Sequence, residues 1–72
     1  MPDWVLARRR QIGARLRDGR VHAGLTQLEL GARIGRDHRT IHRWEYGVRI
    51  PNLDDLLLLA DALDVPLADL VE

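Results

Sequence analysis

The chain has 72 residues, which corresponds to one domain near the lower size limit for folding on its own core. It contains no cysteine, so neither a disulfide nor a thiolate metal site can supplement that core. No apolar stretch approaches the ~20 residues of a membrane span, and no secretory signal is visible. We therefore expect a cytoplasmic protein with no membrane partner.

The net charge of zero conceals a division along the chain. All eleven basic residues are arginines, and all lie within residues 8–49 together with only four acids, which gives this segment a charge of +7. Residues 50–72 contain six acids and no base. The first segment is a candidate surface for a polyanion and the second is not, although arginine runs are also common on solvated helix faces.

The first expected helix begins at Asp3, a candidate N-cap, and runs to about Ala23, with Gly24 as its stop signal. Its apolar stripe would consist of Leu6, Ile12 and Leu16. Gly13 and Gly19 each lower its helix propensity by roughly 1 kcal/mol relative to alanine. Packing against other helices must therefore stabilise it.

Two short helices follow, each with its own start and stop signals. Thr26 and Glu29 have the spacing of a capping box that opens the second helix, and Gly35 ends it. Asp37 is placed to cap the third helix, and Gly47 ends that one. The inward-facing residues of the two helices are Leu30, Ile34, Ile41, Trp44 and Glu45.

Residues 26–47 have the organisation of a helix-turn-helix unit, in which two helices are joined by a tight turn that contains glycine. Gly31 lies where the third helix must approach the second closely, and Gly35 supplies the left-handed backbone of the turn. Ile41 and Trp44 anchor the third helix to the core. Helical periodicity places four residues opposite these anchors: His38, Arg39, His42 and Arg43.

The C-terminal part predicts one longer helix and a short final turn. Asn52 is a candidate N-cap, and Asp54 and Asp55 follow in the first turn, where the helix dipole favours acids. The predicted buried stripe comprises Leu53, Leu56, Leu57, Ala60 and Leu63, with Leu59 at its edge. Leu58 points away from this stripe. Pro66 starts the final turn, which contains Leu67 and Leu70, and the absence of any strand pattern predicts an all-α domain.

A series of spaced residues, spread over about residues 12–70, matches a known pattern. The series comprises Gly24-Leu25-Thr26-Gln27, Leu30-Gly31, Gly35, Thr40-Ile41, Arg43-Trp44-Glu45, Gly47, Arg49, Pro51, Leu56-Leu57 and the run 59–63. It resembles the Cro/phage-repressor type of helix-turn-helix domain, also called the xenobiotic-response-element family. The resemblance implies a compact five-helix, lambda-repressor-like DNA-binding domain over residues 1–72, whose third helix enters the major groove.

The resemblance and the periodicity agree on the base-reading face, which comprises His38, Arg39, His42 and Arg43. Arg39 is our preferred main reader, because a guanidinium can donate two hydrogen bonds to O6 and N7 of guanine. Arg43 can read a base or bind a phosphate. The two histidines can donate to guanine acceptors or to phosphate.

Four further residues are candidates for binding phosphate: Thr26, Gln27, Arg36 and Arg49. Gln27 resembles the family glutamine that braces the recognition helix and touches phosphate. Thr26 stands at the start of the second helix, where backbone N–H groups can donate to a phosphate. Arg36 lies in the turn and Arg49 in the loop after the third helix.

The resemblance also implies structural roles and marks two departures. Arg20 and Glu45 would form a partly buried, bidentate ion pair that joins the first helix to the third, and Trp44 would belong to the core. Arg36 replaces the usual small apolar turn residue. Asp64 stands where a glycine usually ends the fourth helix, so we expect a strained or altered cap there.

These residues bear on three candidate functions. The first is a sequence-specific transcriptional regulator of prokaryotic or phage type that acts as a repressor and binds a palindromic operator as a homodimer, at least on DNA. The second is a protein-interaction role, such as an antitoxin or scaffold, with a partner at Leu28 or Leu58. The third, an enzyme, has no support, since the chain has neither serine nor cysteine and no convergent pair of carboxylates.

Two minor alternatives concern histidines and arginines. His38 and His42 have the i, i+4 spacing of metal ligands, but only His22 and Asp37 could join them, so we expect neither a metal nor any other cofactor. Arg8, Arg9 and Arg10 are interpreted as a solvated face of the first helix rather than as an arm in the minor groove.

Overall fold

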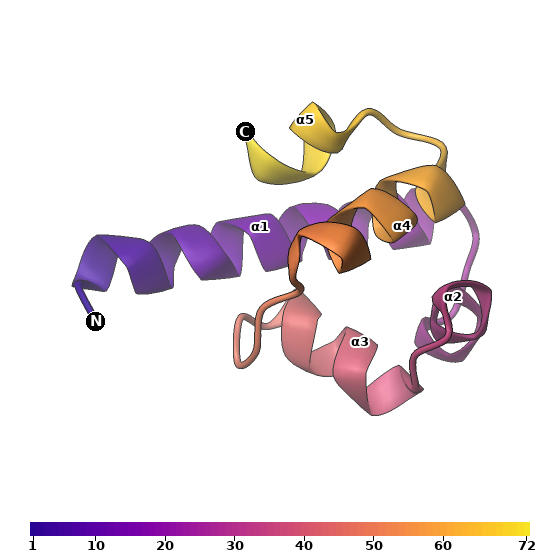
Figure 1. Cartoon of the computed structure of the whole chain (residues 1–72), viewed down its shortest axis with the longest axis horizontal. Coiled ribbons are helices and arrows are strands. Elements are labelled where there is room, and N and C mark those ends of the chain that lie inside the picture. The colour runs from indigo at the N-terminus through magenta and orange to yellow at the C-terminus, as the bar shows by residue number, and fades with distance from the viewer.

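The computed structural model describes all 72 residues and contains helices and no strands, which confirms the all-α class. The five helices are α1 (Asp3–His22), α2 (Gln27–Ile34), α3 (His38–Glu45), α4 (Leu53–Leu63) and α5 (Leu67–Val71) (Figure 1). The N-terminal part of α1 projects beyond the other helices (Figure 1). None of the helices combines the length and the apolar character that crossing a membrane requires.

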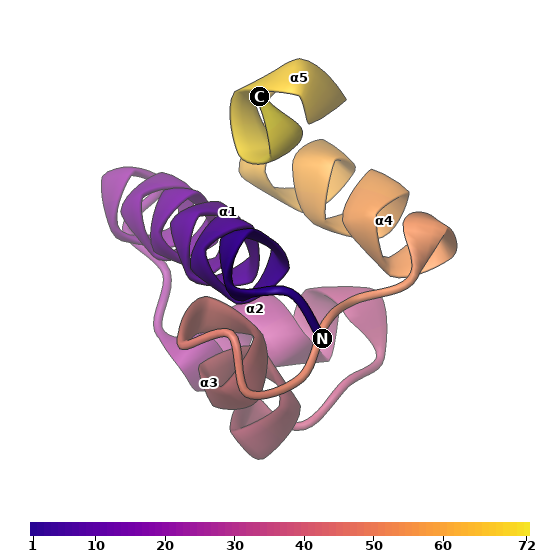
Figure 2. The same cartoon turned by 90° about the vertical axis from the view of Figure 1, so that its left-hand side faces the viewer.

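The long helix α1 packs against two groups of helices. Figure 2 shows α2 and α3 on one side of α1, with α4 and α5 on another, and α1 contacts α3, α4 and α5 directly. The core draws on all five helices and comprises Leu16, Leu30, Ile41, Trp44, Leu59, Ala60, Leu63 and Leu70. Because a fully buried Leu or Ile contributes about 1.5–3 kcal/mol, this shared core holds the helix-turn-helix unit in a fixed orientation.

The N-termini of three helices have the caps that the sequence predicts. The Thr26 hydroxyl accepts from the Glu29 N–H at 3.0 Å, and the Glu29 carboxylate accepts from the Thr26 N–H at 3.0 Å, which completes the capping box of α2. The same kind of bond joins Asp37 to the Thr40 N–H and Asn52 to the Asp55 N–H, at 2.8 Å each. These bonds pair donors that would otherwise have no partner in the first turn.

The start of α1 differs from the prediction. Pro2 occupies the N-cap position with extended backbone, and no side chain caps the helix. Asp3 is therefore the first helical residue, and its prediction as an N-cap was wrong. Proline has no side-chain oxygen that could accept from the N–H groups of the first turn, so the helix begins without a side-chain cap.

The predicted apolar stripes of α1 and α4 need correction. Leu6 is 36% exposed because it lies on the projecting part of α1, whereas Leu16 is buried. In α4, Leu59 is fully buried, while Leu53 and Leu57 are 63% and 49% exposed. Because leucine occurs on most sides of α4, periodicity alone could not decide which side faces the core. The buried side is the one that carries Leu59, Ala60, Leu63 and Asp55.

Glycine permits two close backbone approaches. A Cβ atom at Gly31 would lie 2.4 Å from the carbonyl oxygen of Arg36, so the tight contact is with the turn rather than with α3 itself. A Cβ atom at Gly13 would lie 2.5 Å from the carbonyl oxygens of both Trp44 and Glu45. The sequence had indicated only a cost in helix propensity at Gly13, but this glycine allows α1 to pack directly on the end of α3.

The end of α4 has the altered cap that was expected. Asp64 adopts a left-handed conformation with φ 56°, and it is the one residue other than glycine with positive φ. Gly35 has φ 76° in the turn between α2 and α3. Aspartate tolerates this region better than most residues, although glycine does so at lower energy.

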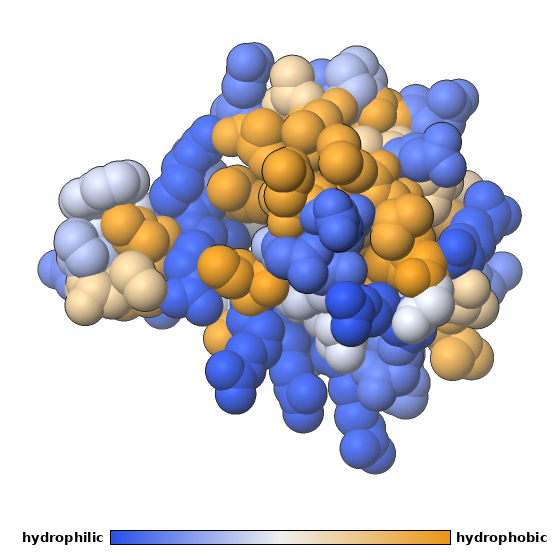
Figure 3. Space-filling model, in the orientation of Figure 1, coloured by the Kyte–Doolittle hydropathy of each residue, from blue (hydrophilic) through white to orange (hydrophobic).

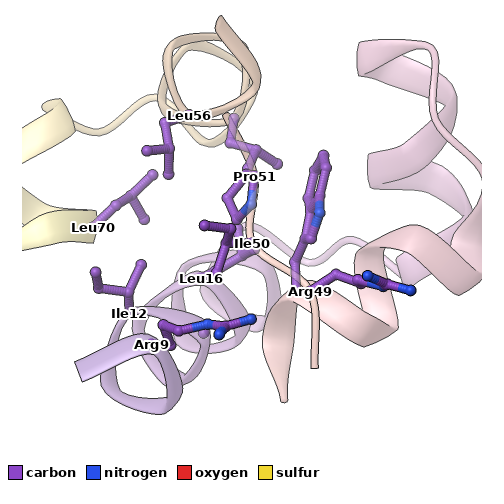
Figure 4. A pocket seen from close by; sticks show the side chains of 11 residues that line it. Arg9, Ile12, Leu16, Arg49, Ile50, Pro51, Leu56 and Leu70 are labelled. Carbon is purple, nitrogen blue, oxygen red and sulfur yellow. The ribbon is translucent and has the colours of Figure 1, made fainter. Parts of the chain in front are cut away.

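A cavity of about 210 Å³ lies between α1, the loop before α4, α4 and α5. Figure 4 shows Ile12, Leu16, Leu56 and Leu70 around it, together with Arg9. The lining residues include no acid, no histidine and no hydroxyl or thiol group. The cavity thus presents apolar surface and positive charge, without a group suited to acid–base or nucleophilic catalysis.

Candidate nucleic-acid interface

Helix α3 has one buried side and one exposed side. Ile41, Trp44 and Glu45 are 0%, 5% and 1% exposed, because they pack against the core and α1. The four predicted base-reading residues, His38, Arg39, His42 and Arg43, are all exposed. They share one side because residues three and four apart are neighbours on a helix. The structure therefore brings the predicted reading residues together on one continuous surface.

The reading residues differ in how far the protein restrains them. None of the side-chain hydrogen bonds involves His38, Arg39 or Arg43. Their donors remain available to an external partner. Hydrophilic side chains project from the side of the molecule where α3 lies (Figure 3), as expected for a surface that meets a polyanion.

The ion pair implied by the resemblance is present between α1 and α3. Arg20 Nε donates to Glu45 Oε2 at 2.6 Å, and its Nη2 donates to Oε1 at 3.1 Å. A third donor, Nη1, bonds the Leu25 carbonyl at 2.9 Å. The hydrogen bond to Glu45 raises the pKa of Arg20 above its ordinary value. This bidentate pair fixes α3 relative to α1 while keeping a buried carboxylate fully paired.

Gln27, the first residue of α2, connects this ion pair to the reading face. Its Nε2 atom lies 3.2 Å from Glu45 Oε1 and 3.4 Å from Nδ1 of His42. Gln27 therefore braces α3 from the neighbouring helix. No ligand contact is needed to place it there, because the buried carboxylate of Glu45 attracts the amide nitrogen.

Sequence reasoning missed two residues beside the reading face. The Tyr46 ring lies 4.7 Å from the His42 ring, with an angle of 41° between the planes. The Arg17 guanidinium lies 5.3 Å from the centre of the Tyr46 ring. The i, i+4 spacing of His42 and Tyr46 was the signal that could have indicated this contact. Arg17 comes from α1 and had no comparable signal.

Among the phosphate candidates, Thr26 and Arg49 are both exposed. The Thr26 N–H is already used in the capping box. The backbone donors left for an anion at this end of α2 are thus those of Gln27 and Leu28, which lie in its first turn and have no backbone acceptor. The same capping bonds, chiefly the one from the Thr26 backbone, lower the pKa of Glu29.

Arg36, the fourth phosphate candidate, has an acidic partner within the protein. Its Nε and Nη2 atoms donate to Asp55 Oδ1 at 3.2 and 2.8 Å. Its guanidinium also lies 5.9 Å from the centre of the Trp44 ring. The side chain is 44% exposed. Arg36 thus links the turn to α4, at a position where the family usually has a small apolar residue.

The run Arg8–Arg10 is only partly the solvated surface that the sequence indicated. Arg8 donates to the Val71 carbonyl at the end of α5 and to Gln11 Oε1. Arg9 lines the cavity beside α5, whereas Arg10 is exposed. The expectation of a solvated face therefore applies to Arg10, while Arg8 and Arg9 pack α1 against the C-terminal part of the chain.

Comparisons with known proteins agree with this geometry. A helix-turn-helix family model matches residues 16–70, so the chain belongs to the helix-turn-helix family, of the Cro/phage-repressor type. It is a sequence-specific DNA-binding regulator. The chain is similar to the restriction-modification controller protein C.AhdI from Aeromonas hydrophila, known from a high-resolution crystal structure. The two share 35% sequence identity with a TM-score of 0.86, and the match covers 90% of this chain and 94% of that chain. No curated protein sequence matches significantly.

Proposed function

We propose that the chain represses transcription as a homodimer that binds a palindromic operator, with α3 in the major groove. The observation that supports this most directly is the exposed side of α3. It carries four side chains suited to base and phosphate contacts, on a helix that the partly buried Arg20–Glu45 pair holds in place. The likeness to a restriction-modification controller over nearly the whole of both chains supports a role as a transcription regulator.

The proposed contacts divide into reading and positioning. Arg39 reads a guanine through two hydrogen bonds, and Arg43 reads a neighbouring base or binds phosphate. The backbone N–H groups at the start of α2, including that of Gln27, bind a phosphate together with Arg49 and set the orientation of α3, while the Gln27 side chain braces His42. Arg36 is the weakest phosphate candidate, because Asp55 already binds its guanidinium.

An apolar surface on α4 is the proposed dimer interface. Leu53 and Leu57 lie one turn apart and are 63% and 49% exposed, and Ile50 in the preceding loop is 60% exposed. Apolar side chains gather over α4 and α5, away from the hydrophilic side that carries α3 (Figure 3). A two-fold dimer would bury these side chains and could place two α3 helices on half-sites about one helical turn apart.

A protein partner is a second candidate, supported by two other exposed leucines. Leu28 on α2 is 65% exposed, and Leu58, on a different side of α4 from Leu53, is 48% exposed. A role that depends on such a partner would survive Arg39→Ala, whereas operator binding would not.

The test is selection of bound sequences from a randomised duplex pool at two salt concentrations. We expect enrichment of a palindrome that contains guanine, and Arg39→Ala should weaken binding to it by about 1–3 kcal/mol and relax the preference at one position. Arg49→Ala should weaken binding to all sequences and reduce the salt slope by about 1. Arg15→Ala, on the part of α1 near α5, is the matched control. Equal, weak binding to every sequence would exclude specific regulation.

A further inference from the structure

The buried carboxylate of Glu45 starts a chain of hydrogen bonds that ends on the reading face. Arg20 occupies both carboxylate oxygens, and Gln27 Nε2 lies 3.2 Å from Oε1. A carboxylate bound to arginine can only accept hydrogen bonds, so Gln27 must turn its nitrogen toward it. The opposite amide orientation would place two acceptors against each other beside a group that is 1% exposed.

The amide orientation of Gln27 determines which nitrogen of His42 carries hydrogen. The same Nε2 atom of Gln27 lies 3.4 Å from His42 Nδ1. A ring nitrogen that faces an N–H donor must accept, so this contact favours the neutral tautomer of His42 in which Nδ1 accepts and Nε2 carries the hydrogen. The Nε2 atom of His42 has no hydrogen-bond partner in the protein, and His42 is exposed.

Tyr46 restrains the same imidazole from a second direction. Its ring lies 4.7 Å from that of His42, and Arg17 lies 5.3 Å from the Tyr46 ring on the side of α1. His42 is therefore held by both a hydrogen bond and an aromatic contact. Arg39 has neither, so it must lose rotamer freedom when it binds.

We propose that Gln27 and Tyr46 present His42 as a fixed Nε2–H donor, which makes His42 a specificity-determining residue of α3. A donor at this position favours base edges with acceptors, such as N7 and O6 of guanine, over the amino group of cytosine. The inference rests on the proposed function, since it takes α3 to face base edges. Arg20, Glu45 and Gln27 act through His42 and are positioning residues in this respect.

The first test uses the free protein, so it does not depend on DNA binding. In two-bond ¹H–¹⁵N correlation spectra at alkaline pH, where histidine is neutral, His42 should show the Nε2–H tautomer alone. Exposed His22 on α1 serves as an internal reference and should show the mixture of an unrestrained imidazole. Gln27→Met should make His42 resemble His22. A mixture at His42 in the unaltered protein, or a predominant Nδ1–H tautomer, overturns the proposal.

The second test measures discrimination on the selected duplex, with each G·C pair under α3 exchanged for C·G. His42→Ala and Gln27→Met should each reduce discrimination at the same pair by about fivefold, and the double variant should lose no more than His42→Ala alone. Arg49→Ala should weaken both duplexes equally and leave the ratio unchanged. Additive losses, or a Gln27→Met effect that is equal for both duplexes, overturn the proposal. If the unaltered protein shows no sequence preference, the proposed function is contradicted. The spectra of the free protein would still determine which ring nitrogen of His42 carries the hydrogen.

Discussion

Two ion pairs connect the helix-turn-helix unit to the rest of the molecule, and they differ in burial. Arg20–Glu45 joins α3 to α1, and its side chains are 14% and 0% exposed. Arg36–Asp55 joins the turn to α4, with side chains 44% and 8% exposed. Both use a guanidinium and a carboxylate. They also differ in geometry, because Arg20 bonds both oxygens of Glu45, whereas both donors of Arg36 bond Asp55 Oδ1.

This difference in burial predicts that Arg20–Glu45 stabilises the fold, whereas Arg36 can leave Asp55 at little cost. Removing one partner of a buried pair leaves an uncompensated charge away from water, which costs far more than the pair itself contributes. A half-exposed arginine can turn to water when its partner is lost, so the cost is small. We therefore expect α3 to be fixed firmly against α1, while Arg36 contributes less to the stability of the fold.

The largest expected effect is that of Glu45→Ala. This change leaves Arg20 without its carboxylate and removes the acceptor that orients Gln27. We expect a loss of about 3–5 kcal/mol in the free energy of unfolding, which would unfold much of a domain of this size. Urea unfolding followed by circular dichroism measures this loss.

The matched control replaces both partners, as Arg20→Met with Glu45→Leu. The double variant should be more stable than Glu45→Ala, because it leaves no unpaired buried charge. A loss below about 1 kcal/mol for Glu45→Ala would contradict the assignment of this pair as structural.

A smaller effect is expected at the second pair. Arg36→Ala should reduce the free energy of unfolding by about 0.5–1 kcal/mol, since the guanidinium is partly solvated. Asp55→Ala should reduce it by about 1–2 kcal/mol, because Asp55 also accepts from the Asn52 N–H in the capping box of α4.

The same variants test the phosphate role of Arg36. Because Asp55 binds the guanidinium, Arg36→Ala should change the salt slope of DNA binding less than Arg49→Ala does. An equal reduction of about 1 for both variants would show that Arg36 leaves Asp55 to bind a phosphate.

The smallest expected effect concerns acid. The backbone N–H of Thr40 lowers the pKa of Asp37, and the capping bonds of Thr26 lower that of Glu29. A carboxyl group whose folded pKa is lowered contributes stability above its unfolded pKa and loses that contribution as pH falls through the folded value. Part of the stability should therefore disappear below about pH 4.

Thermal unfolding at neutral pH and in acid checks this expectation. Asp37→Asn retains a capping oxygen without the charge, so the drop in melting temperature on acidification should be smaller than in the unaltered protein. Asp18→Asn, at an exposed position on α1, is the control and should leave the drop unchanged. An unchanged drop for Asp37→Asn would show that the charge of this cap contributes nothing.

Much of the fold and most of the reading face could be predicted from the sequence. The caps at Thr26, Asp37 and Asn52 are present, and the turn at Gly35 has the expected backbone. The reading residues are exposed because α3 has a clear apolar side at Ile41 and Trp44. These features depend on residues within about one turn of each other, so their spacing is visible in a linear sequence.

Only the tertiary structure decided the remaining features. Which side of α4 is buried was ambiguous, because leucine occurs on most of its sides. The partner of Arg36 was hidden, since Asp55 is nineteen positions away. The role of Gly13 became visible only when α1 was placed against the carbonyl groups of Trp44 and Glu45.

The sequence by itself determined the helix starts, the turn and the exposed side of α3, because local hydrogen bonds and helical periodicity set them. The packing of separate helices decided that Glu45 meets Gln27 as well as Arg20, and that Gln27 meets His42. Such contacts depend on the distance and direction between helices, which residue spacing does not specify. For the same reason, only the packed helices reveal that the buried carboxylate of Glu45 orients Gln27, and that Gln27 in turn orients His42 on the exposed side of α3.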